Sequence, residues 1–261
     1  MQRSSVIDLR PGPWVDRGEV VGMVGAIVAH LATVAGSPVD VFDALDAACH
    51  ELANVEMGFA GVVAPDVHQP TWSFWGGDDH FGVVTTCAAG RRLEQFPLTA
   101  ALGRVTSDGV VVTWEVGRSS TDHPSPPDPV QADGRRVRVS VPSAAEHAAT
   151  VRAVVRSVFD FADDDEQARY LIATTEIFTN AGRATQRRAP RPRIEIDVVV
   201  DPGDGSGALT ITDQSGGWNP DPTSPLDGES GLAIARAFVP GLTRTRGDGG
   251  CVVALPVPPH R

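Results

Sequence analysis

The sequence predicts an α+β fold built as two tandem two-layer α/β sandwiches, each with a mixed, mainly antiparallel sheet and helices on one face. Three observations support this prediction. The chain has 261 residues, enough for two ordinary domains. Residues 117–134, "GRSSTDHPSPPDPVQADG", are rich in Pro, Ser and Asp without apolar periodicity, which is typical of a linker. The halves on either side carry similar segments in the same order, so we expect domains at residues 1–116 and 135–261.

The second half shows the clearer pattern of elements. It opens with "RRVRVSV", whose alternation predicts a half-buried strand. Ser143 followed three residues later by Glu146 resembles a capping box and predicts the start of a helix. A second helix with an acidic first turn, where the helix dipole favours carboxylates, is expected over residues 163–186. The remaining expected elements are strands at 193–201 and 207–213 joined by the turn "PGDGSG", a short helix at 231–239 and a strand at 251–257.

The first half follows this order more loosely. Its expected elements are helices at 16–36 and 39–58, strands at 70–76 and 81–90, a segment at 97–105 and a strand at 108–116. Glu51 precedes Glu176 by 125 positions (176 − 51), and Cys87 precedes Asp213 by 126 (213 − 87). A nearly constant offset through two elements is the pattern of an internal duplication, although this order of elements is common and could also arise independently.

Charge and composition exclude several classes of function. The net charge of −11 disfavours direct binding to nucleic acid or to an anionic membrane. All 22 cationic side chains are arginines, which excludes P-loop NTPases, pyridoxal enzymes and eukaryotic-type kinases, because each of these needs a lysine. Three cysteines without motif spacing argue against a disulfide framework and a zinc site. The apolar residues 20–36 are short for a membrane span, and no signal peptide is evident, so we expect a buried helix and a cytoplasmic protein.

Three short segments of the second half carry polar groups where they could form a site. The run "LIATTEIFTNAGRA" places Glu176 and Asn180 four residues apart, on one face of a helix. Asp213 ends an expected strand and is followed by Gly216 and Gly217, which allow the backbone to approach a ligand closely. Taken alone, Glu176 and Asn180 are better explained as an exposed polar stripe on an amphipathic helix, and the segment at Asp213 would serve as an ordinary turn.

The third segment lies at the start of the short helix. The residues "DGESGL" place Ser230 and Gly231 where free backbone N–H groups and the helix dipole favour an anion. A plain glycine N-cap would look the same. The order of all three segments, with the intervening elements, is more specific than any one of them.

This arrangement resembles the ATP-binding (GHKL or Bergerat-type) domain shared by histidine kinases, gyrase-type ATPases and bacterial anti-sigma-factor serine kinases, most closely the last group. "TTEIFTNA" resembles the motif Glu-x-x-x-Asn-Ala, and "DQSGGWNP" resembles Asp-x-Gly-x-Gly-Phe-Asp-Pro. "GESGLAIARAF" resembles the Gly-x-Gly-Leu stretch, and "GGCVVALPVP" resembles the closing Gly-Thr strand. The resemblance covers residues 137–258 and implies a histidine-kinase-like ATPase fold with ATP and Mg²⁺ as cofactors.

The resemblance implies a role for each matching residue. Asp213 would accept a hydrogen bond from the adenine amine, and Asn180 would ligate Mg²⁺, a hard ion that prefers oxygen. Glu176 would be the catalytic residue that orients or deprotonates an attacking hydroxyl. The remaining expected nucleotide contacts are Arg183, at the start of an arginine-rich stretch that could neutralise phosphates, Gly216, Gly217, Ser230, Gly231 and Leu232. Residues 218–230 would form a lid over the phosphates.

The sequence also departs from the family pattern. Ser215 stands where the second motif has its first glycine, Glu229 and Ser230 alter the third motif, and Cys251 replaces a threonine. When the two halves are aligned, Val55 of the first half corresponds to Asn180, and Cys87 corresponds to Asp213. Neither side chain can bind magnesium or adenine as its counterpart would. We therefore expect residues 1–116 to be a degenerate, nucleotide-free copy that serves packing or protein docking.

These observations lead to one main hypothesis and two alternatives. The main one is a cytoplasmic regulator that binds ATP, holds a sigma factor or another regulator and phosphorylates a serine on an anti-anti-sigma-type antagonist. It would be a monomer if the duplicated half replaces a second subunit, and otherwise a homodimer. The first alternative is a non-catalytic interaction module on the same fold. The second is an atypical histidine kinase, because "HELANVEM" begins with His50 in a His-Glu-Leu sequence like that of a phosphoacceptor box.

Overall fold

The computed structural model divides the chain into two compact units, Met1–Val137 and Arg138–Arg261. The border between the two units falls shortly after the expected linker at 117–134. Pro127 lies within that linker, yet its carbonyl accepts a hydrogen bond from the Thr71 hydroxyl at 2.6 Å, so this residue packs on the first unit. The exact domain limits stay a prediction. The structure describes residues 5–12, 15–34, 46–53, 70–77, 80–86, 103–107, 111–117, 124, 127, 135–186, 192–201, 203–214, 229–246 and 250–259.

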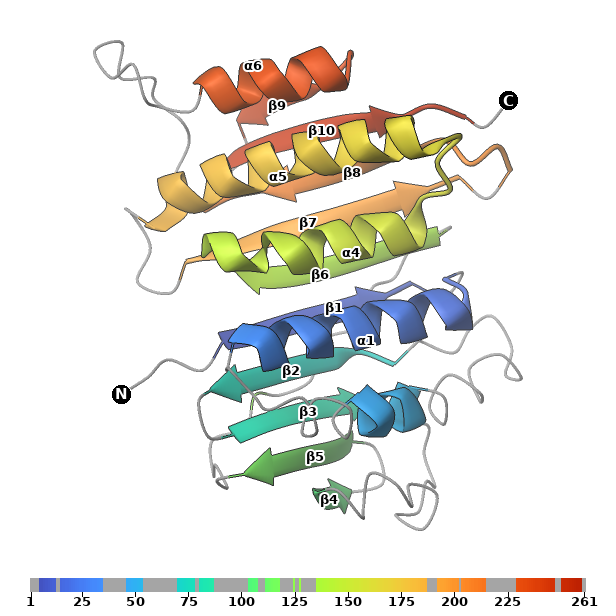
Figure 1. Ribbon diagram of the computed structural model, residues 1–261, viewed down its shortest axis with the longest axis vertical. Helices are drawn as coiled ribbons and strands as arrows, with labels where there is room; N and C mark the ends of the chain where they lie inside the picture. The colour runs from blue at the N-terminus through green and yellow to red at the C-terminus, as the bar shows by residue number, and fades with distance from the viewer. Residues whose placement is uncertain are drawn as a thin grey trace. The chain divides into compact units, whose positions relative to one another are not determined.

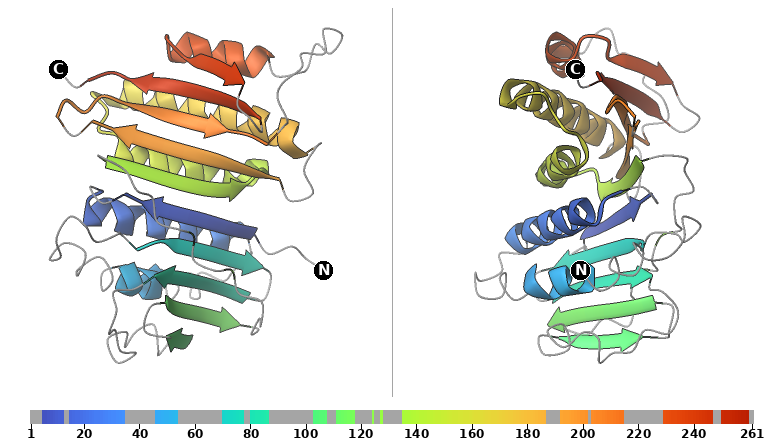
Figure 2. Two further views of the ribbon diagram at one scale, coloured as in Figure 1. Left: turned by 180° about the vertical axis from the view of Figure 1, so that it is seen from behind. Right: turned by 90° about the vertical axis from the view of Figure 1, so that its right-hand side faces the viewer.

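The second unit is a sheet with helices on one face (Figure 1). Its strands lie in the order β6-β7-β8-β10-β9, and the pairs β7–β8, β8–β10 and β10–β9 are antiparallel. The helices α4, α5 and α6 lie on the same side of this sheet (Figure 2). The elements are β6 (Arg135–Pro142), the 3₁₀ turn η2 (Ala145–His147), α4 (Ala148–Val158), α5 (Asp164–Gln186), β7 (Arg193–Val200), β8 (Gly207–Thr212), α6 (Glu229–Phe238), β9 (Thr243–Arg246) and β10 (Cys251–Val257). The predicted α+β class with a mainly antiparallel sheet is confirmed.

The core of this unit follows the two periodicities of its elements. Along β7, every second side chain is buried, from Ile194 to Val200, because successive residues of a strand point to opposite faces. On α5, residues three or four apart are buried, among them Thr174, Phe178 and Ala181. Tyr170, on the same helix, donates its hydroxyl hydrogen bond to the Pro256 carbonyl at 2.5 Å, and burial raises the pKa of this phenol. These buried side chains and the hydrogen bond of Tyr170 fix the face of α5 that packs on the sheet.

The predicted capping box at Ser143 is wrong. The Ser143 backbone is held by its neighbours instead: its N–H donates to the Pro192 carbonyl, and its carbonyl accepts from the Gln186 side chain. Regular α-helix begins only at Ala148, after a 3₁₀ turn whose N-cap has no side-chain hydrogen bond. The N-cap position of this turn is Ala144, so Ser143 lies one residue too early to cap it.

Side-chain caps are found at the start of the next helix, α5. Asp163 accepts from the N–H of Glu166 at 2.7 Å, and Glu166 accepts from the N–H of Ala162 at 2.8 Å. The pair differs from a capping box by one residue, because Glu166 bonds to the N–H of Ala162 rather than to that of Asp163. It fixes the start of α5, the helix that carries the first motif.

The strand β9 was not predicted. Its sequence, "TRTR", is short and has no apolar residue, so it lacks the alternation of a half-buried strand. It pairs only with β10 within the described part of the chain and lies at the edge of the sheet. Charged side chains are common at such an edge, because they discourage pairing with a second chain.

The first unit, taken by itself, has the same strand order. Its sheet runs β1-β2-β3-β5-β4, which matches β6-β7-β8-β10-β9 strand for strand. β3 ends at Thr86 and β8 ends at Thr212, 126 positions later (212 − 86), the offset that relates Cys87 to Asp213. The elements are β1 (Ser5–Pro11), α1 (Arg17–Val34), a helical stretch at 46–53, β2 (Trp72–Gly77), β3 (His80–Thr86), β4 (Arg104–Ser107) and β5 (Val111–Gly117). Duplication stays a prediction, with this shared order in its favour.

Residues 20–34 of the apolar segment form most of α1. Val20, Val24, Ile27, Val28 and Leu31 are buried, at the spacing of one helical face. Within the ranges that the structure describes, no helix combines the length and apolar character that crossing a membrane requires.

Candidate functional site

The first and third motifs meet at Gly231. This glycine lies in the first turn of α6, which packs along α5. A Cβ atom added to Gly231 would overlap the amide nitrogen of Asn180 and lie 3.0 Å from Oε2 of Glu176. The two polar side chains of α5 therefore point at the start of α6, as their i, i+4 spacing predicts. Only a residue without a side chain fits between them without displacing Asn180.

Asp213, from the second motif, lies at the end of β8 and is 6% exposed. Its Oδ1 accepts a hydrogen bond from the backbone N–H of Cys251 at 2.8 Å, and its own N–H donates to the Cys251 carbonyl at 3.0 Å. Gly250 packs directly against it: a Cβ at that position would overlap the Asp213 carbonyl oxygen and lie 2.6 Å from Oδ1. The carboxylate is thus a buried, oriented acceptor, held by the residue that begins β10.

A third contact links Asp213 to the helix that carries Glu176 and Asn180. The backbone N–H of Gln214 donates to the hydroxyl of Thr185 on α5, at 3.2 Å. Thr185 is buried and lies five positions after Asn180 on that helix. The first motif thus lies on the C-terminal half of α5, the third motif contacts it through Gly231, and the second motif contacts it through Gln214.

The other predicted site residues are placed less completely. Arg183 is exposed on α5, and Leu232 is half-buried on α6. Ser230 lies in the first turn of α6, while the orientation of its side chain is outside the described part. Gly216, Gly217 and residues 218–228 of the lid expected at 218–230 lie outside the described residues, as do Val55 and Cys87 of the first half.

At least one arginine of the arginine-rich stretch at 183–193 has a structural role. Arg193 begins β7, and its guanidinium donates to the hydroxyl of Ser140 at 2.7 Å and to the carbonyl of Ser140 at 2.9 Å. This side chain therefore ties β7 to β6 rather than serving a ligand. Arg187, Arg188 and Arg191 lie outside the described residues.

The residues present fit a nucleotide whose phosphates supply most of the metal's ligands. Among the described residues, no group of three or more His, Cys, Asp or Glu side chains could hold a metal ion. Asn180 can offer one amide oxygen, and Mg²⁺ is commonly bound by one or two protein ligands together with phosphates and water. Asp213 offers the fixed acceptor that an exocyclic amine needs.

Sequence reasoning missed the residues that support Asp213. Thr185, Gly250 and the backbone of Cys251 each hold it or its neighbour in place. The glycine pair before Cys251 was the available indication, since close backbone approach requires glycine. Replacement of the family's threonine by Cys251 leaves this support intact, because it comes from the main chain.

His50, the alternative phosphoacceptor, lies on the helical stretch at 46–53 in the first unit. Its ring is 3.5 Å from Asp46 one turn earlier. A Cβ on Gly25 of α1 would lie 2.7 Å from its Nε2, so the ring packs on α1. This geometry does not distinguish a phosphoacceptor from an ordinary helix-packing histidine.

Comparison with known proteins agrees with this placement. Residues 141–256 match the family described as the histidine kinase-like ATPase domain, a range that contains all three motifs. Among solved structures, the histidine kinase domain of the blue-light activated histidine kinase of Erythrobacter litoralis EL346 is similar, with 21% identity and a TM-score of 0.33. The match covers 45% of this chain and 65% of that one, a little less than two thirds of it. No curated protein matches the chain. The family match alone shows that residues 141–256 of the second unit are similar to histidine kinase-like ATPase domains.

Proposed function

We propose that this protein is an ATP-binding regulatory protein whose second unit holds one ATP·Mg²⁺. The observation that carries the proposal is the convergence on α5: Gly231 lies against Asn180 and Glu176, and Asp213 is linked to the same helix through Gln214 and Thr185. The three segments are far apart along the chain, and Glu176, Asn180 and Asp213 are each of the type that the proposed role in nucleotide binding requires. The match of residues 141–256 to the histidine kinase-like ATPase domain supports the same conclusion.

The finer proposal is that the protein acts like the anti-sigma-factor serine kinases. Bound ATP would supply the phosphoryl group in such a reaction. Glu176 is half-buried beside Asn180 and would accept the proton of an attacking serine hydroxyl. Asn180 would hold the metal, and Asp213 would select adenine. The antagonist with that serine, and a sigma factor or other regulator held by this protein, are the proposed partners, and the proposed location is the cytoplasm.

The first unit has a separate place in the proposal. Its strand order equals that of the second unit, but Val55 and Cys87 replace the residues that would hold magnesium and adenine. We therefore assign it a docking or packing role without nucleotide. If it takes the place of a second subunit, the protein is a monomer.

Titration with ATP tests the nucleotide site. We expect Asp213→Ala to abolish detectable ATP binding, because it removes the buried acceptor for the adenine amine. Asn180→Ala should weaken binding only when Mg²⁺ is present, since its role is to ligate the metal. Calorimetry on the full chain, with and without Mg²⁺, measures both effects, and Arg156→Gln, on the exposed side of α4, is a control.

If neither Asp213→Ala nor Asn180→Ala changes the affinity, the site is wrongly assigned. If the wild type binds no ATP at all, the non-catalytic interaction module becomes the better account. Transfer of phosphate from ATP to a serine protein would then be absent as well.

A further inference from the structure

The helix α6 is apolar on two faces. On its inner face Ala235 is 0% exposed, whereas on its outer face Ile234 is 41% exposed and Phe238 is 36% exposed. Residues 230–241 contain one charged residue, Arg236. A helix at a protein surface normally presents polar side chains to water, and a helix that is apolar on both faces is normally covered on both. The outer face of α6 therefore has the character of a surface that another molecule covers.

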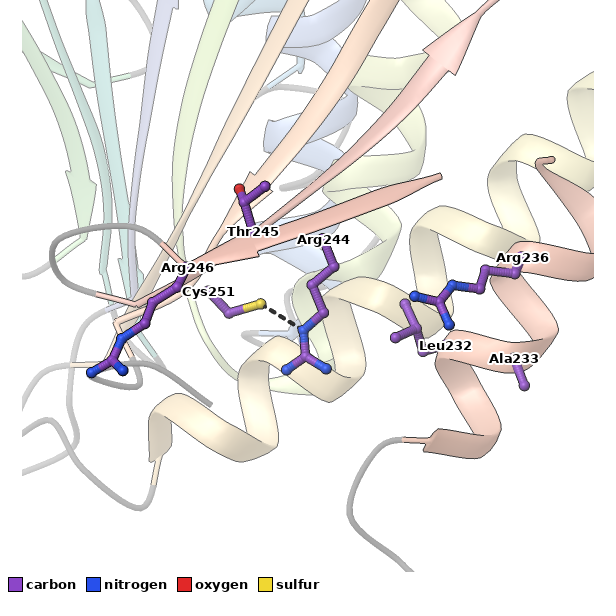
Figure 3. A pocket seen from close by; sticks show the side chains of 7 residues that line it. All are labelled: Leu232, Ala233, Arg236, Arg244, Thr245, Arg246 and Cys251. Atoms are coloured by element: carbon purple, nitrogen blue, oxygen red, sulfur yellow. Dashed lines mark hydrogen bonds between the residues drawn. The ribbon is translucent and has the colours of Figure 1, made fainter. Parts of the chain in front are cut away.

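This outer face is distinct from the side of α6 that faces the edge of the sheet. Figure 3 shows Leu232 and Arg236 directed from α6 toward β9. A step of two residues turns a helical side chain by about 200°, so Ile234 and Phe238 leave the helix on the opposite flank. The exposed pair is thus separate from the nucleotide contact expected at Leu232.

A third exposed apolar side chain, Ile172, lies on the neighbouring helix α5. It is 42% exposed and comes one turn before Glu176, on the same helical face. Gly231 lies against Glu176, and Ile234 and Phe238 follow that glycine at the i+3 and i+7 positions of one helical face. Figure 1 shows α6 running beside α5, so the two faces border each other at Glu176. Three of the four large apolar side chains that are exposed in the described part of the chain thus form one apolar patch, Ile172, Ile234 and Phe238.

The size of the apolar patch favours a transient partner over a permanent second copy of this chain. The helix α6 has 10 residues, so its outer face is about 15 Å long and about 10 Å wide. A stable interface buries about 800 Å² on each partner, and the patch supplies a fraction of that area. A few apolar side chains surrounded by a polar surface are typical of the anchor of a smaller complex.

The position of the apolar patch indicates which partner this is. Four residues of a helix span about 6 Å, so Ile172 lies one turn from Glu176, and Ile234 lies within one turn of Gly231. A protein that brings a serine hydroxyl to Glu176 covers a surface much wider than one turn. Such a protein lies over the patch as well.

We propose that the apolar patch is the docking surface for the serine-bearing protein substrate, which binds it through apolar side chains close to its acceptor serine. This inference rests on the proposed function, because it takes Glu176 as the residue that the serine hydroxyl approaches. It narrows the substrate class to proteins that carry large apolar side chains about one helical turn from that serine. Docking at the patch holds the hydroxyl in place before transfer, which removes part of the entropic barrier.

Binding of two synthetic peptides to the full chain tests the docking surface without ATP. Both are short helical peptides with a single serine. One carries leucines at the third and fourth positions after the serine, and the other carries glutamines there. We expect the leucine peptide to bind at least about fivefold more tightly, measured by fluorescence anisotropy, because only its side chains bury apolar surface on the patch. Equal binding of the two peptides, or binding of neither, overturns the proposal.

Variants of the patch locate the binding. Ile234→Gln/Phe238→Gln should remove the preference for leucine, and Ile172→Gln should weaken it. Glutamine is a good helix former, so both helices should persist, and an unchanged affinity for ATP shows that they do. Val199→Thr is the matched control, because Val199 is 39% exposed on β7, outside the patch, and threonine suits a strand. A preference that survives in the glutamine variants, or that disappears in the Val199 variant, contradicts the proposal.

Addition of ATP and Mg²⁺ separates this inference from the proposed function. Phosphate transfer to the leucine peptide with a lower KM than for the glutamine peptide supports both. Leucine-selective binding without any transfer supports the docking surface and contradicts the serine kinase proposal. Transfer to both peptides with the same KM contradicts the docking surface and leaves the kinase proposal in place.

Discussion

Gly231→Ala is expected to lower the affinity for ATP·Mg²⁺ by at least about tenfold, equivalent to about 1.4 kcal/mol, without unfolding the protein. The added Cβ would overlap the Asn180 amide and crowd Glu176, so the amide must turn away from the position in which it can hold magnesium. The obstacle is a side chain that can move, and alanine is a better helix former than glycine. The melting temperature should therefore stay level or rise slightly while binding falls.

A double-mutant cycle isolates this effect. In the Asn180→Ala background the obstructing amide is gone, so Gly231→Ala should cost little further affinity. Calorimetric titration with ATP and Mg²⁺ on the four proteins measures the coupling. Fully additive losses would show that Gly231 affects binding through something other than Asn180.

Gly250→Ala is expected to destabilise the second unit by about 3 kcal/mol and to remove ATP binding as a consequence. Here the added Cβ meets main chain: it would overlap the Asp213 carbonyl oxygen and lie 2.6 Å from its carbonyl carbon. The start of β10 must then move away from the end of β8. That movement breaks the hydrogen bond from the Cys251 N–H to the Asp213 carboxylate.

Chemical denaturation followed by circular dichroism measures this cost. Gly203→Ala is the matched control, because Gly203 lies in the exposed turn between β7 and β8. Among the described residues, its added Cβ would contact the side chain of Asp201 and no main chain. We expect that change to stay within about 0.5 kcal/mol. Equal stability of the Gly250 variant and the wild type would mean that β10 does not hold Asp213 as described.

Much of the second unit could be predicted from local patterns. The i, i+4 spacing of Glu176 and Asn180 and the position of Asp213 at a strand end depend only on helix and strand periodicity, and the structure places all three accordingly. The hydrogen bond from Gln214 to Thr185 could not be predicted, because it depends on how α5 packs across the end of β8. The same is true of the contact between Gly250 and Asp213, which joins residues 37 positions apart (250 − 213).

The errors have physical causes too. Ser143 and Glu146 carry the residue types of a capping box, but the Ser143 backbone is engaged by Pro192 and Gln186, so the cap is not formed. The pattern gives no information about that competition. β9 escaped prediction because strand propensity depends on what a strand packs against, and an edge strand of threonine and arginine has little apolar surface to reveal it.

Equilibrium binding of ATP and GTP to the full chain in the presence of Mg²⁺ tests the central claim most directly. The account predicts one ATP per chain, because only the second unit retains the required residues. It also predicts at least about tenfold weaker binding of GTP, since guanine presents an acceptor where the Asp213 carboxylate needs an amine donor. Two ATP per chain, equal affinity for both nucleotides or no binding of either would contradict it.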